Sequence, residues 1–176
     1  MAALSTLSPG KHIPDDINVI IEIAANGDPV KYELDKETGL LKVDRFMTTA
    51  MFYPCNYGFI PNTLSNDGDP VDVLVMAPFP IQPGSLIRCR AVGVLQMTDE
   101  SGEDYKVLAL PVEKICMQYA NMKTLQDIPK TMLDSISHFF EHYKKLEPNK
   151  WVKIGDWLDK SAAAKEINDS VGRYKK

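Results

Sequence analysis

The spacing of apolar residues changes once along the chain, and this change constrains the fold more than any other feature. In the first two thirds, apolar side chains recur at every second position, as they do through 17–23, which is the pattern of strands. In the last third the spacing becomes helical, with one broad apolar face along 130–146 and a second helix expected over 159–174. Short strands followed by helices predict an α+β fold, in which helices pack against a small sheet or barrel.

Turn signals divide the first two thirds into short segments. The Asn-Gly-Asp-Pro sequence at 26–29 is a strong turn signal, and we expect the strands on either side of it to form a β-hairpin. Residues 48–70 are rich in Pro, Gly and Asn, so we expect a long loop there, and such a loop inside a compact domain is usually functional or disordered. Its aromatic residues argue against disorder. The expected strands are 17–23, 30–34, 40–46, 71–77, 86–97 and 105–112.

Composition and charge argue against several classes of protein. The 176 residues are 44% hydrophobic, enough for one buried core, and we expect residues 1–176 to form a single domain. The net charge of −4 is unlike that of nucleic-acid-binding proteins, which present a basic face. The longest apolar stretch, 73–81, contains two prolines and is too short to cross a bilayer. We therefore expect neither nucleic acid nor a membrane as a partner.

The cysteines and the N-terminus together predict a compartment. Cys55, Cys89 and Cys116 are far apart and form no Cys-x-x-Cys pair, so they match neither a disulfide framework nor a zinc site. Residues 1–11 lack the basic start and apolar run of a signal peptide. A reducing, cytoplasmic compartment is the expectation.

Three carboxylates come close together in a segment that is expected to be partly buried. Turn preferences explain Asp67 and Asp69, and an exposed acidic turn is the simpler interpretation of these two. Asp72 lies inside the apolar strand at 71–77, where an ionised carboxylate is costly unless a cation or paired donors compensate it. A bound metal ion accounts for all three.

A second acidic group flanks a short Gly-containing loop at 99–104, which can join the strands 86–97 and 105–112 as a hairpin. Asp99 and Asp104 would then face each other across its open end, where like charges destabilise the pairing. A bridging cation is one interpretation and an exposed acidic loop is the other. All-oxygen ligands suit Mg²⁺ or Mn²⁺. The sixth position counted from Asp67 is not Gly, so the segment is no EF-hand loop.

Basic and phenolic side chains favour a phosphate substrate for such a metal site, because Mg²⁺ with Lys and Arg stabilises charge on a transferring phosphoryl group. Each of them also has a simpler interpretation. Lysines on strands are usually solvated, and Tyr143 lies on the apolar face of the expected helix, where core packing is its simpler role. The candidates are Lys31, Arg45, Tyr53, Tyr57, Lys106, Tyr143 and Lys144.

Several short segments, in order along nearly the whole chain, resemble the soluble family I inorganic pyrophosphatases of the bacterial type. The most specific is the Asp-x-Asp-Pro-x-Asp core at 67–72. The resemblance implies a five-stranded barrel of OB-like topology with helices packed against it, hydrolysis of pyrophosphate to two orthophosphates, several Mg²⁺ ions with other divalent ions as substitutes, and a homohexamer. The other matching segments are 30–33, 44–46, 53–61, 99–106 and 142–144.

The resemblance also implies roles for the matched positions. Asp69 is placed beside the nucleophilic water and is the candidate general base, and Asp72 is our candidate for bridging two ions. The implied metal ligands are Asp67, Asp72, Asp99 and Asp104, with Glu22 and Glu33 for outer ions. The implied phosphoryl-binding residues are Lys31, Arg45, Tyr57, Tyr143 and Lys144, with Lys106 close by.

Two rival interpretations come from other features of the sequence. His138 and His142 complete a His-x-x-Glu-His pattern, which is typical of one class of zinc peptidases. They lie opposite the apolar face of the helix, and the chain has only one further histidine, so we expect an exposed pair or a subunit contact. The other rival is an OB-type module for single-stranded nucleic acid or a small ligand. Such modules combine stacking aromatics with a basic groove, whereas the candidate surface is acidic.

Overall fold

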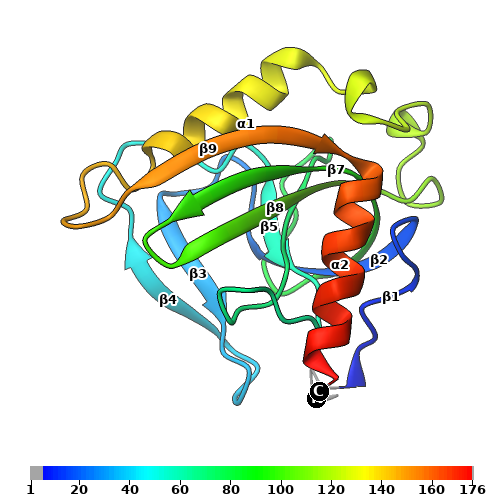
Figure 1. Ribbon diagram of the computed structural model, residues 1–176, viewed down its shortest axis with the longest axis horizontal. Helices are drawn as coiled ribbons and strands as arrows, with labels where there is room; N and C mark the ends of the chain where they lie inside the picture. The colour runs from blue at the N-terminus through cyan, green and yellow to red at the C-terminus, as the bar shows by residue number, and fades with distance from the viewer. Residues whose placement is uncertain (1–5, 176) are drawn as a thin grey trace.

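The computed structural model describes residues 6–175 and combines a large sheet with two helices (Figure 1). The mixture of strands and helices that the sequence predicts is confirmed. The strands are β1 (Gly10–His12), β2 (Asp16–Ile23), β3 (Val30–Leu34), β4 (Leu41–Phe46), β5 (Asn56–Phe59), β6 (Asp72–Val75), β7 (Leu86–Asp99), β8 (Gly102–Pro111) and β9 (Val152–Asp159). The helices are α1 (Lys130–His142) and α2 (Lys160–Tyr174), with short 3-10 turns η2 (Met117–Tyr119) and η3 (Leu125–Asp127).

The main sheet has seven strands in the order β1-β2-β5-β6-β8-β7-β9, and β2 pairs with β7 as well. The first half of β2 pairs with β7 and its second half pairs with β5. The pairings therefore run from β2 through β5, β6, β8 and β7 back to β2. β6 and β8 are parallel, whereas β7 and β8 form the antiparallel hairpin that the sequence predicts. The prediction that Asp99 and Asp104 face each other across its end is wrong. The strands extend to residues 99 and 102, so Asp99 pairs with Gly102 and Asp104 pairs with Met97.

The hairpin predicted across 26–29 is wrong. β3 does not pair with β2 but with β4, in a separate two-stranded sheet. The physical reason lies in burial: β2 is buried on nearly all its length and needs partners on both of its edges within the core, whereas β3 and β4 are largely half-buried or exposed. The turn at 26–29 therefore leads the chain out of the main sheet.

Three strands, β1, β5 and β9, lie where none is expected. β5 interrupts the predicted loop 48–70, and all four of its residues are buried. Its Asn-Tyr-Gly-Phe sequence lacks β-branched residues, which explains why the pattern gave no strand signal. β9 adds to the outer edge of β7. The helix predicted over 130–146 ends as α1 at His142, while α2 begins and ends close to its predicted bounds.

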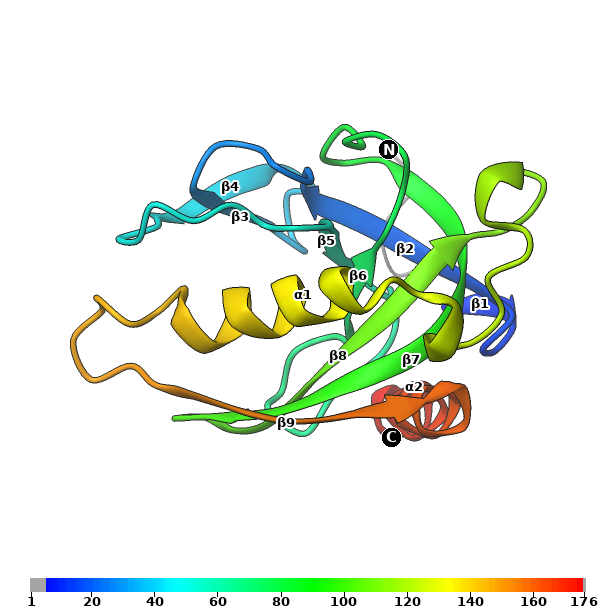
Figure 2. The ribbon, with the colours of Figure 1, turned by 90° about the horizontal axis from the view of Figure 1, so that it is seen from above.

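Two apolar layers hold the fold together. One lies under α1, which runs beside β9 (Figure 1, Figure 2) and buries Ile136, Phe139 and Phe140, as the helical pattern predicts. The other lies beside α2 and includes Ala163 and Ile167. Because successive side chains of a strand point to opposite faces, β6 and β8 contribute alternate residues to the two layers. In the described part of the chain, no helix is long and apolar enough to cross a membrane.

The β2–β5 pairing requires a residue without a side chain at position 58. A Cβ atom on Gly58 would lie 1.9 Å from the Ile20 carbonyl oxygen and 2.9 Å from the Ile21 Cα, both of which belong to the backbone. Gly58→Ala should therefore force the two strands apart and lower the free energy of unfolding by about 3 kcal/mol. Urea unfolding followed by circular dichroism measures this change.

Gly172→Ala is the matched control for this substitution. Gly172 is exposed in α2, with nothing within 4 Å of the added Cβ, so its substitution should raise the free energy of unfolding by about 0.5–1 kcal/mol. Equal stability of the two variants would contradict the close approach of β2 and β5.

Candidate functional site

The centre of the charged site is the buried Lys106. The parallel register of β6 and β8 places Lys106 beside Asp72, and its ammonium donates a short hydrogen bond to the Asp72 carboxylate. The same Nζ atom lies 2.6 Å from Asp104 Oδ1 and 3.3 Å from the Tyr57 hydroxyl. Only 3% of Lys106 is exposed. An ammonium buried this deeply is tolerated because charged and polar partners surround it.

The pKa shifts in this group show a shortage of positive charge. Burial alone would lower the pKa of Lys106, but Asp72 and Asp104 outweigh it and hold this pKa well above its usual value. Burial and the nearby Asp72 raise the pKa of Asp67, although the Asp69 N–H, 3.0 Å from Asp67 Oδ1, acts in the opposite direction. Burial, Asp72 and Asp67 also raise the pKa of Asp104, against the effect of Lys106. Three carboxylates therefore share one ammonium.

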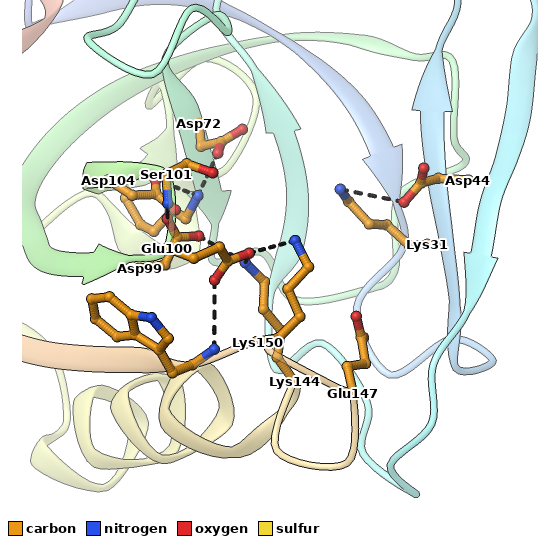
Figure 3. A network of polar contacts seen from close by, with 12 residues as sticks. Lys31, Asp44, Asp72, Asp99, Glu100, Ser101, Asp104, Lys144, Glu147 and Lys150 are labelled. Carbon is orange, nitrogen blue, oxygen red and sulfur yellow. Dashed lines mark hydrogen bonds and ion pairs between the residues drawn. The ribbon is translucent and has the colours of Figure 1, made fainter.

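A second charged group lies at the tip of the β7–β8 hairpin (Figure 3). Lys144 Nζ is 2.7 Å from Asp99 Oδ2 and 3.6 Å from Glu100 Oε1, and Lys150 Nζ is 2.5 Å from the same Glu100 atom. Burial opposes the charged form of Lys144, but Tyr143, Asp99 and Glu100 together raise its pKa. The residues directly after α1 therefore bring cations to the hairpin tip.

Tyr143 connects the two groups. Burial raises the pKa of its hydroxyl, and both Lys106 and Lys144 act against that rise because their positive charges lie near the same oxygen. Tyr143 also packs on Phe139, with ring centroids 5.2 Å apart, so it has the core role expected from the helix pattern as well. Tyr53, the other phenolic candidate of the 48–70 segment, is buried between Tyr57 and Phe139.

A third charged group belongs to the β3–β4 sheet. Lys31 Nζ lies 2.9 Å from Glu33 Oε1 and 3.5 Å from Asp44 Oδ2. Burial works against the charged form of Lys31, but these carboxylates raise its pKa. Arg45 shares Asp44 with Lys31, with its Nη1 atom 3.2 Å from Asp44 Oδ2, and its Nε atom lies 3.3 Å from Glu147 Oε1. In Figure 3, Lys31 and Asp44 lie across from the group that contains Asp72.

A pocket of about 320 Å³ separates the β3–β4 sheet from the strands that carry Asp72 and Tyr57. Glu22 is part of its wall, where its Oε1 atom accepts a hydrogen bond of 2.7 Å from the Leu34 N–H. Burial, with Asp72 and Glu33 nearby, raises the pKa of Glu22 to about 7 despite that hydrogen bond. We call this space the charged pocket. Its wall includes Glu22, Lys31, Glu33, Tyr57, Asp69 and Asp72.

The structure brings the candidate residues together in three charged groups and not in one pocket. The candidates that do not line the charged pocket are Tyr53, Asp67, Asp99, Asp104, Lys106, Tyr143, Lys144 and Arg45. Arg45 belongs to the group on the β3–β4 sheet. Its guanidinium binds Asp44 and Glu147 and does not line the charged pocket. Sequence reasoning missed Asp44, Glu147 and also Lys42, which lies 3.5 Å from Glu33 and lines the pocket. Pairing β3 with β4 across the turn at 36–39 would have placed Lys42 opposite Glu33, as the register does.

The donor atoms of the site are of the type that a hard divalent cation prefers, although they are not arranged around one in the described residues. Among residues 6–175, no three His, Cys, Asp or Glu side chains are arranged to hold a metal ion, and Lys106 and Lys144 contact carboxylates of the candidate set. The donor set is nonetheless all oxygen, and its carboxylates outnumber the ammonium beside them, so an added cation would be stabilised there. His138 and His142 stack on the outer side of α1 with ring centroids 4.4 Å apart, and the structure gives them no third metal ligand within its described part.

Comparison with known proteins identifies the family. The family model described as inorganic pyrophosphatase matches residues 19–175. The chain is 61% identical to an inorganic pyrophosphatase of Yersinia pestis and 58% identical to one of Escherichia coli K12, over 99% and 98% of both chains respectively. The solved structure of an inorganic pyrophosphatase from Coxiella burnetii superposes with a TM-score of 0.93 at 61% identity, covering 96% of this chain and 99% of that one. Since these matches span nearly the whole length, the chain belongs to the inorganic pyrophosphatase family.

Proposed function

We propose that the chain hydrolyses inorganic pyrophosphate to two orthophosphates. Family membership supports this reaction, and one structural observation indicates which residues would take part in it. Carboxylates from two separate segments, 67–72 and 99–104, converge next to buried lysines and a pocket with further charged residues. Such a site can hold both divalent cations and a multiply charged anion.

Several Mg²⁺ ions per site are the proposed cofactor, with Mn²⁺ or other divalent ions as substitutes. When bound, they would lower the pKa of a coordinated water and neutralise phosphoryl oxygens. Asp67, Asp72, Asp99 and Asp104 are the proposed ligands, and Asp72 is the candidate for bridging two ions because it lies between the charged pocket and Lys106. Glu22 and Glu33, on the pocket wall, are proposed for outer ions.

Asp69 is the proposed general base. It lines the charged pocket beside Asp72, and its backbone N–H donates to Asp67 Oδ1, which holds the turn that carries it. A carboxylate there can accept the proton of an attacking water.

The proposed binding of pyrophosphate uses an exchange of partners. Lys31, Lys106 and Lys144 each contact carboxylates in the structure. Phosphoryl oxygens would take over these ammonium groups, and the released carboxylates would become available to cations. Tyr57 and Tyr143 lie beside Lys106 and would donate to the same phosphoryl groups, and Arg45 would reach them after leaving Glu147.

We propose that β2, β5, β6, β8 and β7 form a five-stranded barrel of OB-like topology, which the ring of pairings supports. We also propose that residues 1–176 form one domain. Such a domain should unfold in a single cooperative transition. The free cysteines Cys55, Cys89 and Cys116 support a reducing, cytoplasmic location. A disulfide found in the protein isolated from its own cells would argue against it.

The reaction is tested by measuring phosphate release from pyrophosphate with Mg²⁺, with EDTA, and with ATP as the control substrate. We expect release with Mg²⁺ and its loss with EDTA. Asp72→Asn should lower turnover by at least about 100-fold, because the central carboxylate loses its charge, and should leave the circular dichroism spectrum unchanged.

Asp156→Asn is the matched control, since Asp156 is exposed on β9. It should retain wild-type turnover. Near-normal activity of the Asp72 variant would refute the bridging role, whereas no phosphate release by the wild-type protein would refute the reaction.

Glu22 makes the stability of the metal-free protein depend on pH. Its pKa is raised to about 7 in the fold, so the folded state binds its proton more tightly than the unfolded chain does. The contribution to the free energy of unfolding is therefore full below the unfolded pKa, near 4.5, and is lost as pH rises to about 7. The loss is at most about 3 kcal/mol.

Glu22→Gln should remove this dependence. In EDTA, the variant should gain stability relative to the wild type between about pH 5 and pH 8, measured by urea unfolding. Glu103→Gln, at an exposed position of β8, is the control. It should leave the change in the free energy of unfolding between about pH 5 and pH 8 as it is in the wild type. An identical pH dependence of the Glu22 variant and the wild type would contradict the assigned environment.

We propose a homo-oligomer, a hexamer by family resemblance, with His138 and His142 at a subunit contact. The position of the stacked pair on the outer side of α1 supports a contact with a second chain. Two imidazoles at so short a distance repel each other when both are protonated. Acidification from about pH 8 to pH 5 should therefore weaken assembly. Light scattering should detect this in the wild type and not in His138→Ala/His142→Ala. The same assembly in both proteins at every pH would remove the proposal.

A further inference from the structure

A second cavity, of about 260 Å³, lies apart from the charged pocket, between the first turn of α1 and the segments that follow β2 and β6. Sulfur-containing side chains are concentrated in its wall. The chain has eight methionines and three cysteines, and four of these residues, from four separate segments, line this one cavity. We call it the sulfur cavity. The four are Cys55, Met76, Met122 and Met132.

The spacing of two of these sulfur atoms suits a shared ion. Cys55 Sγ lies 3.9 Å from Met132 Sδ. A first-row metal binds sulfur at about 2.3 Å, so two sulfur ligands on one three-coordinate ion lie about 4 Å apart. The pair is therefore already at ligand spacing, without movement of the backbone.

The rest of the lining selects against hard cations. Apart from Asn26 and Tyr119, the described residues of this wall that carry no sulfur are Ala, Pro and Phe, and none is Asp, Glu or His. Mg²⁺ requires oxygen ligands and finds none of its preferred ones here. Thiolate and thioether ligands favour Cu(I).

The cavity has a rigid frame, which is what a binding site needs. Asn56 is fully buried, and its Oδ1 atom accepts hydrogen bonds from the Ala25 and Ile81 N–H groups at 3.0 and 2.7 Å. Its Nδ2 atom donates to the Val75 and Phe79 carbonyl oxygens at 3.2 and 3.4 Å. One side chain thus holds two of the segments that form the wall.

We propose that the sulfur cavity binds one Cu(I) ion, through Cys55 Sγ and the thioether of Met132, with Met76 and Met122 completing the coordination. Binding breaks the S–H bond of Cys55 and forms a sulfur–copper bond, and the proton leaves to water. Burial raises the pKa of this thiol to about 12, so the empty cavity holds it neutral and apolar. The proposal is independent of the hydrolytic function.

The test is competition for Cu(I) between the full-length protein and the chelator bicinchoninate, without oxygen and with ascorbate as reductant. We expect the wild type to withdraw one equivalent of Cu(I) per chain. Cys55→Ala and Met132→Leu should each weaken binding by about tenfold or more, since even outer partners of a metal site carry that much affinity. If Cys55→Ala does not fold, Met122→Leu/Met132→Leu tests the same site with near-isosteric changes.

Two control variants distinguish this cavity from other sulfur groups. Cys89→Ala removes a thiol buried in the layer beside α2, and Met97→Leu removes a buried thioether that does not line the cavity. Both should bind Cu(I) like the wild type. X-ray absorption of the copper complex should detect only sulfur neighbours at about 2.3 Å.

Three results would overturn the proposal. The first is a wild-type protein that takes no copper from the chelator. The second is undiminished binding by Cys55→Ala or by Met122→Leu/Met132→Leu. The third is nitrogen or oxygen ligation together with loss of binding in His138→Ala/His142→Ala, which would place the ion on the outer face of α1.

Discussion

The ion pairs of Lys106 with Asp72 and Asp104 are the interaction on which the rest of the structure depends. Removing an ammonium and two carboxylates from water is costly, and the cost is recovered only if the geometry of the pairs is fixed. The parallel register of β6 and β8 fixes it, because it sets Asp72 directly beside Lys106. The apolar residues that follow on both strands then anchor that register in the core. Packing and charge placement are therefore one constraint.

Each lysine ammonium of the site is paired with carboxylates, and this arrangement links stability to function. Lys31, Lys106 and Lys144 each contact at least two carboxylates, so the resting site avoids isolated buried charges. An anion with divalent cations can replace these pairs without leaving either sign uncompensated. A substrate without its cations cannot, because the carboxylates would then face one another unpaired. The same pairs that stabilise the empty protein thus favour joint binding of anion and metal.

The sequence predicts which charged residues lie close together better than it predicts the strand pairing. Asp72 is recognisable because a carboxylate inside an apolar strand requires compensation, and this can be read from spacing alone. The partner of β3 cannot be read in this way, since the alternation of a strand gives its faces and not its neighbour. β5 was missed because its burial comes from its place between β2 and β6, while its Asn-Tyr-Gly-Phe sequence carries no strand signal. The Arg45–Glu147 contact joins residues far apart in sequence, so only the fold could identify it.

The chemistry of the two cavities diverges along β5. Cys55, just before this strand, and Tyr57, within it, point to the same apolar layer under α1, yet one reaches sulfur neighbours and the other the Lys106 ammonium. The Tyr53 ring packs 5.1 Å from the Tyr57 ring and 4.6 Å from the Phe139 ring, so aromatic side chains pack behind Tyr57 in this layer. This packing excludes water from the inner side of the charged group, which strengthens its ion pairs. No described residue of the sulfur cavity wall is Asp or Glu. One layer therefore presents hard oxygen donors in one place and soft sulfur donors in another.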